Sequence, residues 1–141
     1  MSIDSRASTS QPSPIEKKKI LVVNDESDMT TMLKMTLERE GFTVDTFNDP
    51  TQALKSYKPR LYDLIMLDVI MPKMDGFDLY TQLKKTDPEV NICFLTASSE
   101  VYREELMKGK YDELSRDLFL EMPLQPAELV DEIKKRISSV Q

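Results

Sequence analysis

The 141-residue chain has no histidine and only one cysteine, and both shortages narrow the chemistry open to it. Without histidine it can form no imidazole metal site and no catalytic triad that depends on histidine. Cys93 has no second cysteine with which to form an internal disulfide. A lone cysteine favours a reducing, cytoplasmic setting.

Long apolar runs and an excess of positive charge are missing as well. No apolar stretch approaches the length of a membrane span, and the first residues lack the apolar core of a signal peptide. The net charge of −6 argues against a nucleic-acid-binding face, which needs clustered basic residues. We therefore expect a cytoplasmic protein that binds neither membrane nor nucleic acid.

The order of apolar and polar stretches predicts one folded domain. Residues 1–16 hold five Ser and two Pro, so we expect a disordered tail there and a single domain over residues 17–141. Apolar runs predict strands at residues 20–23, 43–47, 64–68, 92–95 and 118–120, and helical spacing predicts helices at about 28–40, 50–58, 77–86 and 127–137. This alternation indicates an α/β protein with a doubly wound parallel sheet.

The central stretch, residues 64–76, carries the strongest signal. Four apolar residues run directly into Asp68, and such a run without alternation is typical of a strand covered on both faces. Asp68 then stands at the carboxyl end of that strand, where ligands and catalytic groups gather in open α/β sheets. A simpler interpretation is that Asp68 only begins a turn.

Acidic or hydroxyl residues follow or close three of the predicted strands, namely Asp25, Asp68 and Thr96. Right-handed crossovers bring these strand ends to one edge of the sheet. Two carboxylates suffice for Mg²⁺, which keeps several waters, and an Asp can act as a nucleophile that forms an aspartyl phosphate. Taken singly, Asp25 could cap a helix, Thr96 could be a turn hydroxyl and Met122 could fill the core. Taken together, the strand ends favour a site for phosphoryl transfer.

Four segments of the chain resemble the receiver domains of response regulators in two-component signalling. They are Val-Asn-Asp-Glu at 23–26, Leu-Asp-Val-Ile-Met-Pro at 67–72 with Asp-Gly at 75–76, Leu-Thr-Ala at 95–97, and Phe-Leu-Glu-Met-Pro at 119–123. The resemblance, closest to the chemotaxis regulator type, covers residues 17–141. It implies a flavodoxin-like sheet of five parallel strands in the order 2-1-3-4-5, with helices on both faces.

The resemblance also implies roles for individual residues. Asp68 is the phosphoacceptor, and Mg²⁺ is bound by Asp25, Asp68 and the backbone carbonyl of Ile70. Thr96 closes on the phosphoryl group, and Phe119 is the aromatic residue that rotates with it. The phosphoryl donor is a phosphohistidine on a partner histidine kinase or phosphotransfer protein, because this chain has no histidine.

Two site positions depart from the family pattern. Asn24 stands where the family has an acid, and Met122 replaces the Lys before Pro123, whose preceding peptide bond is implied to be cis. One negative and one positive charge are lost together, so the field on an incoming phosphoryl group changes less than with either substitution alone. The amide of Asn24 can still accept a hydrogen bond from a metal-bound water, whereas Met122 can only pack. We expect a working but retuned site, whose phosphorylation shifts the conformation only partly.

The segment between the fourth and fifth strands is the third departure. Twenty-two residues separate Thr96 from Phe119, more than the family usually has. Residues 111–116 could extend the helix expected in this segment. The surface built by this helix, the fifth strand and the last helix is the usual output surface of the family.

Two functions remain open. The first is a single-domain response regulator that acts through a downstream protein partner, since the sequence ends at Gln141 with its last helix. It is not a conventional enzyme, because at most it transfers a phosphoryl group to its own Asp and removes it again. The second is a pseudo-receiver, an interaction module independent of phosphorylation, which Asn24 and Met122 favour. A hydrolase of the haloacid dehalogenase type is disfavoured, because Ile70 stands where a second Asp is needed.

Overall fold

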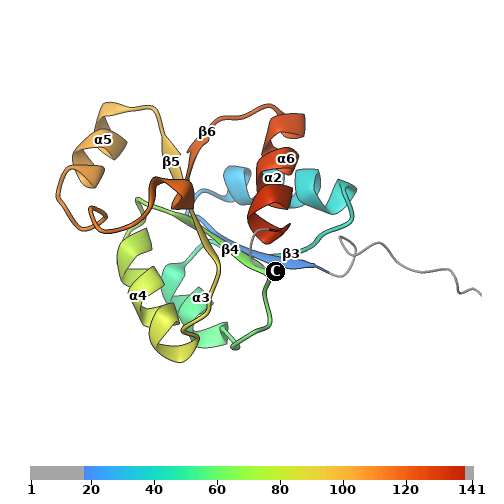
Figure 1. Cartoon of the computed structure of the whole chain (residues 1–141), viewed down its shortest axis with the longest axis horizontal. Helices are drawn as coiled ribbons and strands as arrows, with labels where there is room; N and C mark the ends of the chain where they lie inside the picture. The colour runs from blue at the N-terminus through green and yellow to red at the C-terminus, as the bar shows by residue number, and fades with distance from the viewer. Residues whose placement is uncertain (1–17, 139–141) are drawn as a thin grey trace, which may run out of the picture.

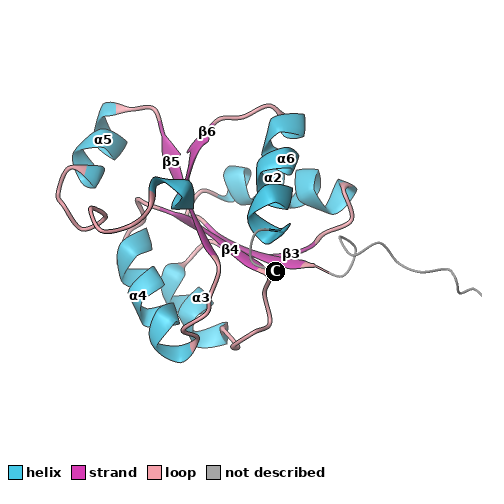
Figure 2. Cartoon of the chain, in the orientation of Figure 1, coloured by secondary structure: helices cyan, strands magenta, loops and turns pink. Residues whose placement is uncertain are grey.

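The apolar runs of the sequence form five strands of one sheet in the computed structural model, which describes residues 18–138 (Figures 1 and 2). The strands are β2 (Lys19–Val23), β3 (Thr43–Phe47), β4 (Leu64–Asp68), β5 (Ile92–Ala97) and β6 (Phe119–Met122). They lie in the order β3-β2-β4-β5-β6, and every neighbouring pair is parallel. The predicted order 2-1-3-4-5 is therefore confirmed. The tail predicted for residues 1–16 lies outside the described residues.

Helices connect the strands and cover both faces of the sheet. They are α2 (Ser27–Arg39), α3 (Pro50–Ser56), α4 (Gly76–Thr86), α5 (Glu100–Leu106) and α6 (Pro126–Ser138), together with a 3₁₀ turn, η2 (Arg116–Leu118). Helices α2 and α6 lie on one face, and α3 and α4 lie on the other (Figure 1). Helix α5 lies apart from both pairs and has no buried residue. No helix among residues 18–138 is long and apolar enough to cross a bilayer.

The helix starts follow from capping side chains. Asp49, Asp75 and Ser99 each accept a hydrogen bond from a backbone N–H of the first turn of α3, α4 and α5. Such side chains satisfy donors that the helix itself leaves unpaired. Helix α2 differs, because its N-cap residue is Glu26, whose side chain makes no capping bond. The alternative that Asp25 caps this helix is therefore wrong.

Strand β4 is central, and all five of its residues are buried. Leu64 and Met66 belong to the apolar cluster shared with α2 and α6, while Ile65 and Leu67 belong to the cluster shared with α3 and α4. A strand covered on both faces needs apolar residues at successive positions, which explains the run without alternation. Asp68 ends this strand and is itself only 4% exposed.

Helix α4 begins directly against the end of β4. A Cβ atom at Gly76 would lie 2.5 Å from the backbone carbonyl oxygen of Asp68, so only glycine fits at this close approach. The N–H of Gly76 donates to the carbonyl of Val69 at 3.1 Å. The loop between β4 and α4 is thereby held tightly beside Asp68.

The connection from β5 to β6 differs from the prediction. Helix α5 ends at Leu106, and residues 111–116 form turns and the start of η2, so the expected extension of this helix is wrong. Gly109 has a φ of +92°, a left-handed conformation that turns the chain away from the helix axis. Tyr111 is then buried, and its hydroxyl accepts a hydrogen bond from the N–H of Phe77 at 2.9 Å. Leu118, expected in the last strand, belongs to η2 instead.

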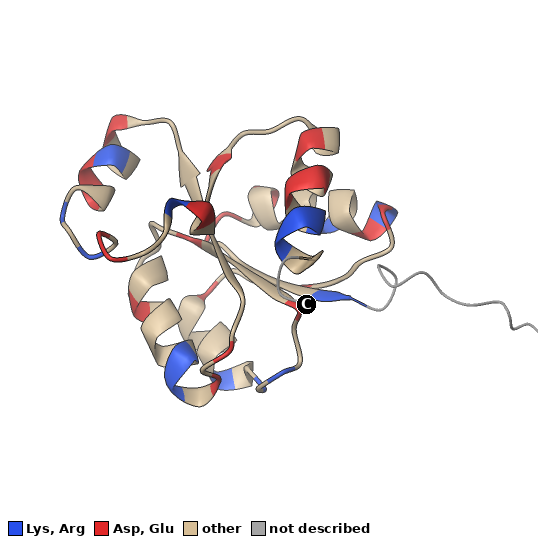
Figure 3. Cartoon of the chain, in the orientation of Figure 1, with Lys and Arg blue, Asp and Glu red and all other residues tan. Residues whose placement is uncertain are grey.

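Charged residues are distributed over several elements rather than gathered in one basic stretch (Figure 3). Helix α6 carries acidic residues near its start, such as Glu128, and Lys135 and Arg136 in its last turn. This arrangement complements the dipole of the helix.

Candidate functional site

The candidate site lies at the carboxyl edge of the sheet, where β2 and β4 end side by side. Val23, the last residue of β2, pairs with Leu67, the residue before Asp68. The two residues after Val23, Asn24 and Asp25, therefore enter the loop beside Asp68. The register thus brings the strand-end residues of β2 and β4 to one edge, as parallel strands require.

Asp68 uses its two carboxylate oxygens differently. Oδ1 accepts a hydrogen bond from the backbone N–H of Ile70 at 3.1 Å and another from the hydroxyl of Tyr102 at 2.6 Å. Within residues 18–138, no hydrogen bond or ion pair reaches Oδ2. The carboxylate is thus fixed through one oxygen, and the other keeps its lone pairs for a ligand.

The electrostatic surroundings of Asp68 disfavour its negative charge. Burial raises the pKa of Asp68 to about 6, the carboxylates of Asp25 and Glu26 add to the rise, and the two hydrogen bonds to Oδ1 oppose it. Among the described residues, no lysine or arginine forms an ion pair with Asp68. These carboxylates are therefore best suited to bind a cation that prefers oxygen ligands.

The residues implied to bind Mg²⁺ form a sparse set. Two carboxylates, from Asp25 and Asp68, would be joined by the backbone carbonyl of Ile70, which follows in the same loop. Residues 18–138 contain no group of three or more His, Cys, Asp or Glu side chains placed to hold a metal. Mg²⁺ is commonly bound through one or two carboxylates while it keeps several waters, so the sparse set fits this ion.

Asn24 holds the loop between β2 and α2. The side chain is 3% exposed, and its amide oxygen accepts a hydrogen bond from the N–H of Glu26 at 3.0 Å. Its backbone carbonyl accepts from the side-chain amide of Asn48 at 2.8 Å. The expected contact between Asn24 and a metal-bound water stays a prediction. Asp25, next in the chain, is exposed at the same edge.

Thr96 and Phe119 come together on neighbouring strands. Thr96 lies within β5, so it is not a turn residue, and it lines a hollow of about 580 Å³ together with Phe119, Tyr111 and Glu121. The ring of Phe119 stacks on that of Phe94, with 5.2 Å between the ring centroids. Two of the three residues expected in the switch, Thr96 and Phe119, therefore line one space, while Met122 does not, and the rotation of Phe119 stays a prediction.

Met122 is placed differently from these residues. It is 4% exposed and belongs to the apolar cluster that includes Leu95, Leu129 and Ile133, on the face of α2 and α6. The Met122–Pro123 peptide bond is cis, as predicted. The packing agrees with the alternative in which Met122 fills the core, and its part in a switch stays a prediction.

Sequence reasoning missed Tyr102 altogether. This residue lies in the first turn of α5, and 34 positions separate it from Asp68 in the sequence. Burial raises the pKa of its hydroxyl above the usual range, and the hydrogen bond to the Asp68 carboxylate raises it further. The only local signal is Ser99, whose side chain caps α5 and thereby fixes where Tyr102 falls on the helix.

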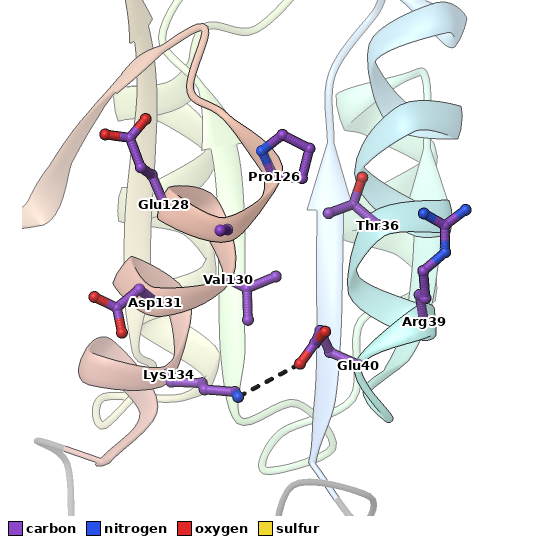
Figure 4. Close-up of a pocket in the computed structure, with 9 residues that line it drawn as sticks. Thr36, Arg39, Glu40, Pro126, Glu128, Val130, Asp131 and Lys134 are labelled. Atoms are coloured by element: carbon purple, nitrogen blue, oxygen red, sulfur yellow. Dashed lines mark hydrogen bonds and ion pairs between the residues drawn. The ribbon is translucent and has the colours of Figure 1, made fainter.

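A second hollow, of about 620 Å³, lies between α2 and α6 (Figure 4). Lys134 crosses it and forms an ion pair with Glu40 at 3.5 Å. Its lining combines both signs of charge, and none of the predicted site residues contributes to it. The candidate site is therefore the carboxyl edge of the sheet.

Comparison with known proteins agrees with this geometry. The family described as response regulator receiver domain matches residues 20–134. The chain is 38% identical over 117 residues to the alkaline phosphatase synthesis transcriptional regulatory protein PhoP of Bacillus subtilis, covering 83% of the chain and 47% of PhoP. It is 36% identical over 120 residues to the transcriptional regulatory protein PrrA of Mycobacterium tuberculosis, covering 85% of the chain and 50% of PrrA. The chain thus spans about half the length of these curated relatives.

One solved structure is informative for the site. The response regulator TrrA of Thermotoga maritima, crystallised in complex with Mg²⁺ and BeF, is 32% identical to this chain. It superimposes with a TM-score of 0.65, covering 84% of this chain and 98% of TrrA.

Proposed function

The chain belongs to the response regulator receiver domain family, and from this premise we propose that it accepts a phosphoryl group on Asp68 and signals by a conformational switch. One observation carries the proposal. The Asp68 carboxylate is buried at the end of the central strand, fixed through Oδ1, and left without a partner on Oδ2 among the described residues. A carboxylate oriented in this way is prepared to act as a nucleophile.

The proposed donor is the phosphohistidine of a partner histidine kinase or phosphotransfer protein. An oxygen of Asp68 forms the new P–O bond while the P–N bond of the donor breaks, and the electron pair of that bond stays on the imidazole nitrogen. The N–H of Ile70 holds the carboxylate in one orientation during this exchange. Hydrolysis of the resulting acyl phosphate returns the chain to its resting state.

Mg²⁺ is the proposed cofactor. Asp25, Asp68 and the carbonyl of Ile70 would hold the ion, and the amide of Asn24 would accept a hydrogen bond from one of its waters. When bound, the ion neutralises negative charge on the phosphoryl oxygens. The shortage of positive charge around Asp68 supports this assignment, as does the Mg²⁺–BeF complex of the related TrrA.

The proposed output is a contact with a downstream protein. Thr96 and Phe119, which line one hollow beside the site, are the residues we assign to the switch. The net charge of −6 supports a protein partner rather than nucleic acid, and the free, buried thiol of Cys93 fits a cytoplasmic location. The proposal concerns the receiver alone, because PhoP and PrrA are about twice as long as this chain.

A second candidate is a pseudo-receiver that binds its partner without phosphorylation. Two observations favour it. The hydroxyl of Tyr102 already occupies Oδ1 of Asp68, and the side chain of Met122 packs in the core, where it offers no donor to a phosphoryl oxygen.

Incubation with acetyl phosphate and Mg²⁺, followed by intact mass measurement, separates the two functions. The wild type should gain the mass of one phosphoryl group, and Asp68→Asn should gain none because the nucleophile is gone. Asp45→Asn serves as the matched control, since this aspartate accepts a hydrogen bond from Tyr62 and should not affect labelling. Equal labelling of Asp68→Asn and wild type contradicts the proposal, and absence of any labelling favours the pseudo-receiver.

A further inference from the structure

Oδ1 of Asp68 carries two donors, and they come from different parts of the fold. The N–H of Ile70 belongs to the loop after β4, while the hydroxyl of Tyr102 belongs to α5. A carboxylate oxygen offers about two lone-pair positions, so these two bonds fill Oδ1. Oδ2 is free of partners among residues 18–138, so when Mg²⁺ and a phosphoryl group bind the carboxylate together, one of them takes Oδ2 and the other needs Oδ1 and must displace one of its donors. The hydroxyl of Tyr102 is the removable one, because the Ile70 N–H is built into the short turn beside Asp68.

Helix α5 is attached to the rest of the molecule by few contacts. None of its residues is buried, Val101 within it is 62% exposed, and Met107, which follows its last residue, is 76% exposed. Tyr102 and Leu106 are its partly buried apolar members that pack on the cluster of α3 and α4. A helix held in this way can move without disturbing the core. The hydrogen bond from Tyr102 to Asp68 therefore links the position of α5 to the state of the phosphoacceptor.

We propose that Tyr102 is a displaceable cap on Asp68, which competes with Mg²⁺ and an incoming phosphoryl group for the carboxylate and releases α5 when they bind. The proposal rests on the proposed function, because it assumes that Asp68 is the phosphoacceptor. In the resting chain the phenol holds Oδ1 at 2.6 Å and fixes α5 over the site. A ligand on Oδ1 takes the place of this bond, so α5 loses one of its few points of attachment.

Tyr102→Phe tests the cap, because it removes the hydroxyl and keeps the ring. The chain offers a matched control in Tyr62→Phe, since the hydroxyl of Tyr62 donates to a carboxylate oxygen of Asp45 at 2.7 Å. Both substitutions remove a bond from a phenol to an aspartate, and only one of these bonds lies at the site. Tyr102→Leu is a second variant that removes the hydroxyl together with the ring. Its result therefore does not depend on the position that a Phe ring takes beside Asp68.

Two measurements are made on each protein. The first is the affinity for Mg²⁺, by titration with and without beryllofluoride, and the second is amide hydrogen exchange of residues 100–106. We expect Tyr102→Phe and Tyr102→Leu to bind Mg²⁺ about tenfold more tightly than wild type, because a competing hydrogen bond to a charged group is gone. We also expect their α5 amides to exchange faster without ligand, as the wild-type amides do once Mg²⁺ and beryllofluoride are bound. Tyr62→Phe should match wild type in both measurements.

The outcomes distinguish this inference from the proposed function. If wild type binds Mg²⁺ and beryllofluoride and both Tyr102 variants bind no more tightly, the cap is wrong while the proposed function stands. If α5 exchange is the same in wild type and variants, with and without ligand, the release of α5 is wrong. If none of the proteins responds to Mg²⁺ and beryllofluoride, the proposed function and the cap both fall.

Discussion

At the scale of single residues, Met122 shows how the surroundings of a side chain decide whether a charge can stand at its position. A lysine at this position would bring a charged donor, but its ammonium would need a path out of the apolar cluster that surrounds Met122. Burial of an unpaired charge is costly, whereas methionine packs in irregular apolar space without penalty. The resting fold of this chain is therefore built around an uncharged residue 122.

We predict that Met122→Lys lowers the free energy of unfolding by about 2–4 kcal/mol, because it places an ammonium in the core. Met122→Leu, which keeps the volume and the apolar character, should lose less than about 1.5 kcal/mol. Urea denaturation of the three proteins measures both effects. A lysine variant as stable as wild type contradicts the packing described here.

The same variant tests the partial switch. If the new lysine reaches the phosphoryl position, its charge-assisted hydrogen bond is worth about 1.5–3 kcal/mol and should enlarge the response to Mg²⁺ and beryllofluoride. The measurement is the shift of the amide resonances of Thr96 and Phe119 in Met122→Lys and in wild type. Full and identical responses in both proteins show that residue 122 does not control the switch.

Asp87 gives a prediction for the dependence of stability on pH. It is 7% exposed, and its carboxylate accepts hydrogen bonds from the hydroxyl of Tyr57 at 2.7 Å and from the N–H of Arg60 at 3.0 Å. Burial opposes ionisation, but the hydrogen bonds prevail and hold the pKa of Asp87 below its usual value. Because its pKa is lower in the folded chain, the ionised carboxylate of Asp87 stabilises the fold at pH values above the unfolded pKa of about 4. This stabilisation is lost as the pH falls through the folded pKa.

We therefore expect Asp87→Asn to lower the free energy of unfolding by about 1–2 kcal/mol at pH 7. The difference from wild type should shrink at pH 3, below the unfolded pKa, because proton binding there favours the unfolded chain. Urea denaturation at the two pH values checks the sign. An equal difference at both pH values shows that the charge of Asp87 does not stabilise the fold.

At the scale of elements, the start of α4 joins the site to the long connection between β5 and β6. Asp75 accepts a hydrogen bond from the N–H of Asp78 at 2.8 Å and forms an ion pair with Lys110 at 2.7 Å. Tyr111, next to Lys110, accepts from the N–H of Phe77. One helix end therefore holds residues 110 and 111 in place through both charge and hydrogen bonding.

We predict that Asp75→Ala lowers the free energy of unfolding by about 1 kcal/mol or more, because it removes both the N-cap and the ion-pair partner. Lys110→Ala keeps the N-cap and removes the partly exposed ion pairs of Lys110 with Asp75 and Asp78, so it should lose less than about 1 kcal/mol. Thermal or urea denaturation of the two variants compares the losses. Equal losses would mean that the cap contributes nothing beyond the ion pair.

Most elements could be predicted because their signals are local. Apolar runs mark the strands, and Asp49 and Asp75 mark the starts of α3 and α4. Residues 98–118 could not be predicted, because two tertiary contacts position them. The hydroxyls of Tyr102 and Tyr111 reach Asp68 and Phe77, and each pair is separated by 34 residues in the sequence. No period or motif within this segment encodes these partners.

The candidate site likewise has features that could be predicted from the sequence and features that could not. Asp25 and Asp68 could be placed from the sequence because parallel strands put their carboxyl ends at one edge. The hydrogen bond from Tyr102 and the core position of Met122 could not, because both depend on contacts with side chains that are distant in the sequence. The order of the strands could thus be predicted from this sequence, whereas the contacts between individual side chains could not.

At the scale of the whole molecule, residues 18–138 combine a sheet whose central strand is fully buried with a helix, α5, that has no buried residue. The strands and four helices share two apolar clusters, and β4 is buried throughout. Helix α5 contributes no buried residue to either cluster. Local opening of α5 therefore exposes little surface, whereas opening of β4 requires the loss of both clusters.

We predict that native-state hydrogen exchange at low urea separates these two parts. Amides of α5 should exchange through local opening, with a small free energy that is nearly independent of urea, because little surface is exposed. Amides of Ile65, Met66 and Leu67 should exchange only through global unfolding, with the urea dependence of the whole chain. If the α5 amides follow that same global dependence, α5 is part of the cooperative core, and Asp68 chemistry could not release it without unfolding the domain.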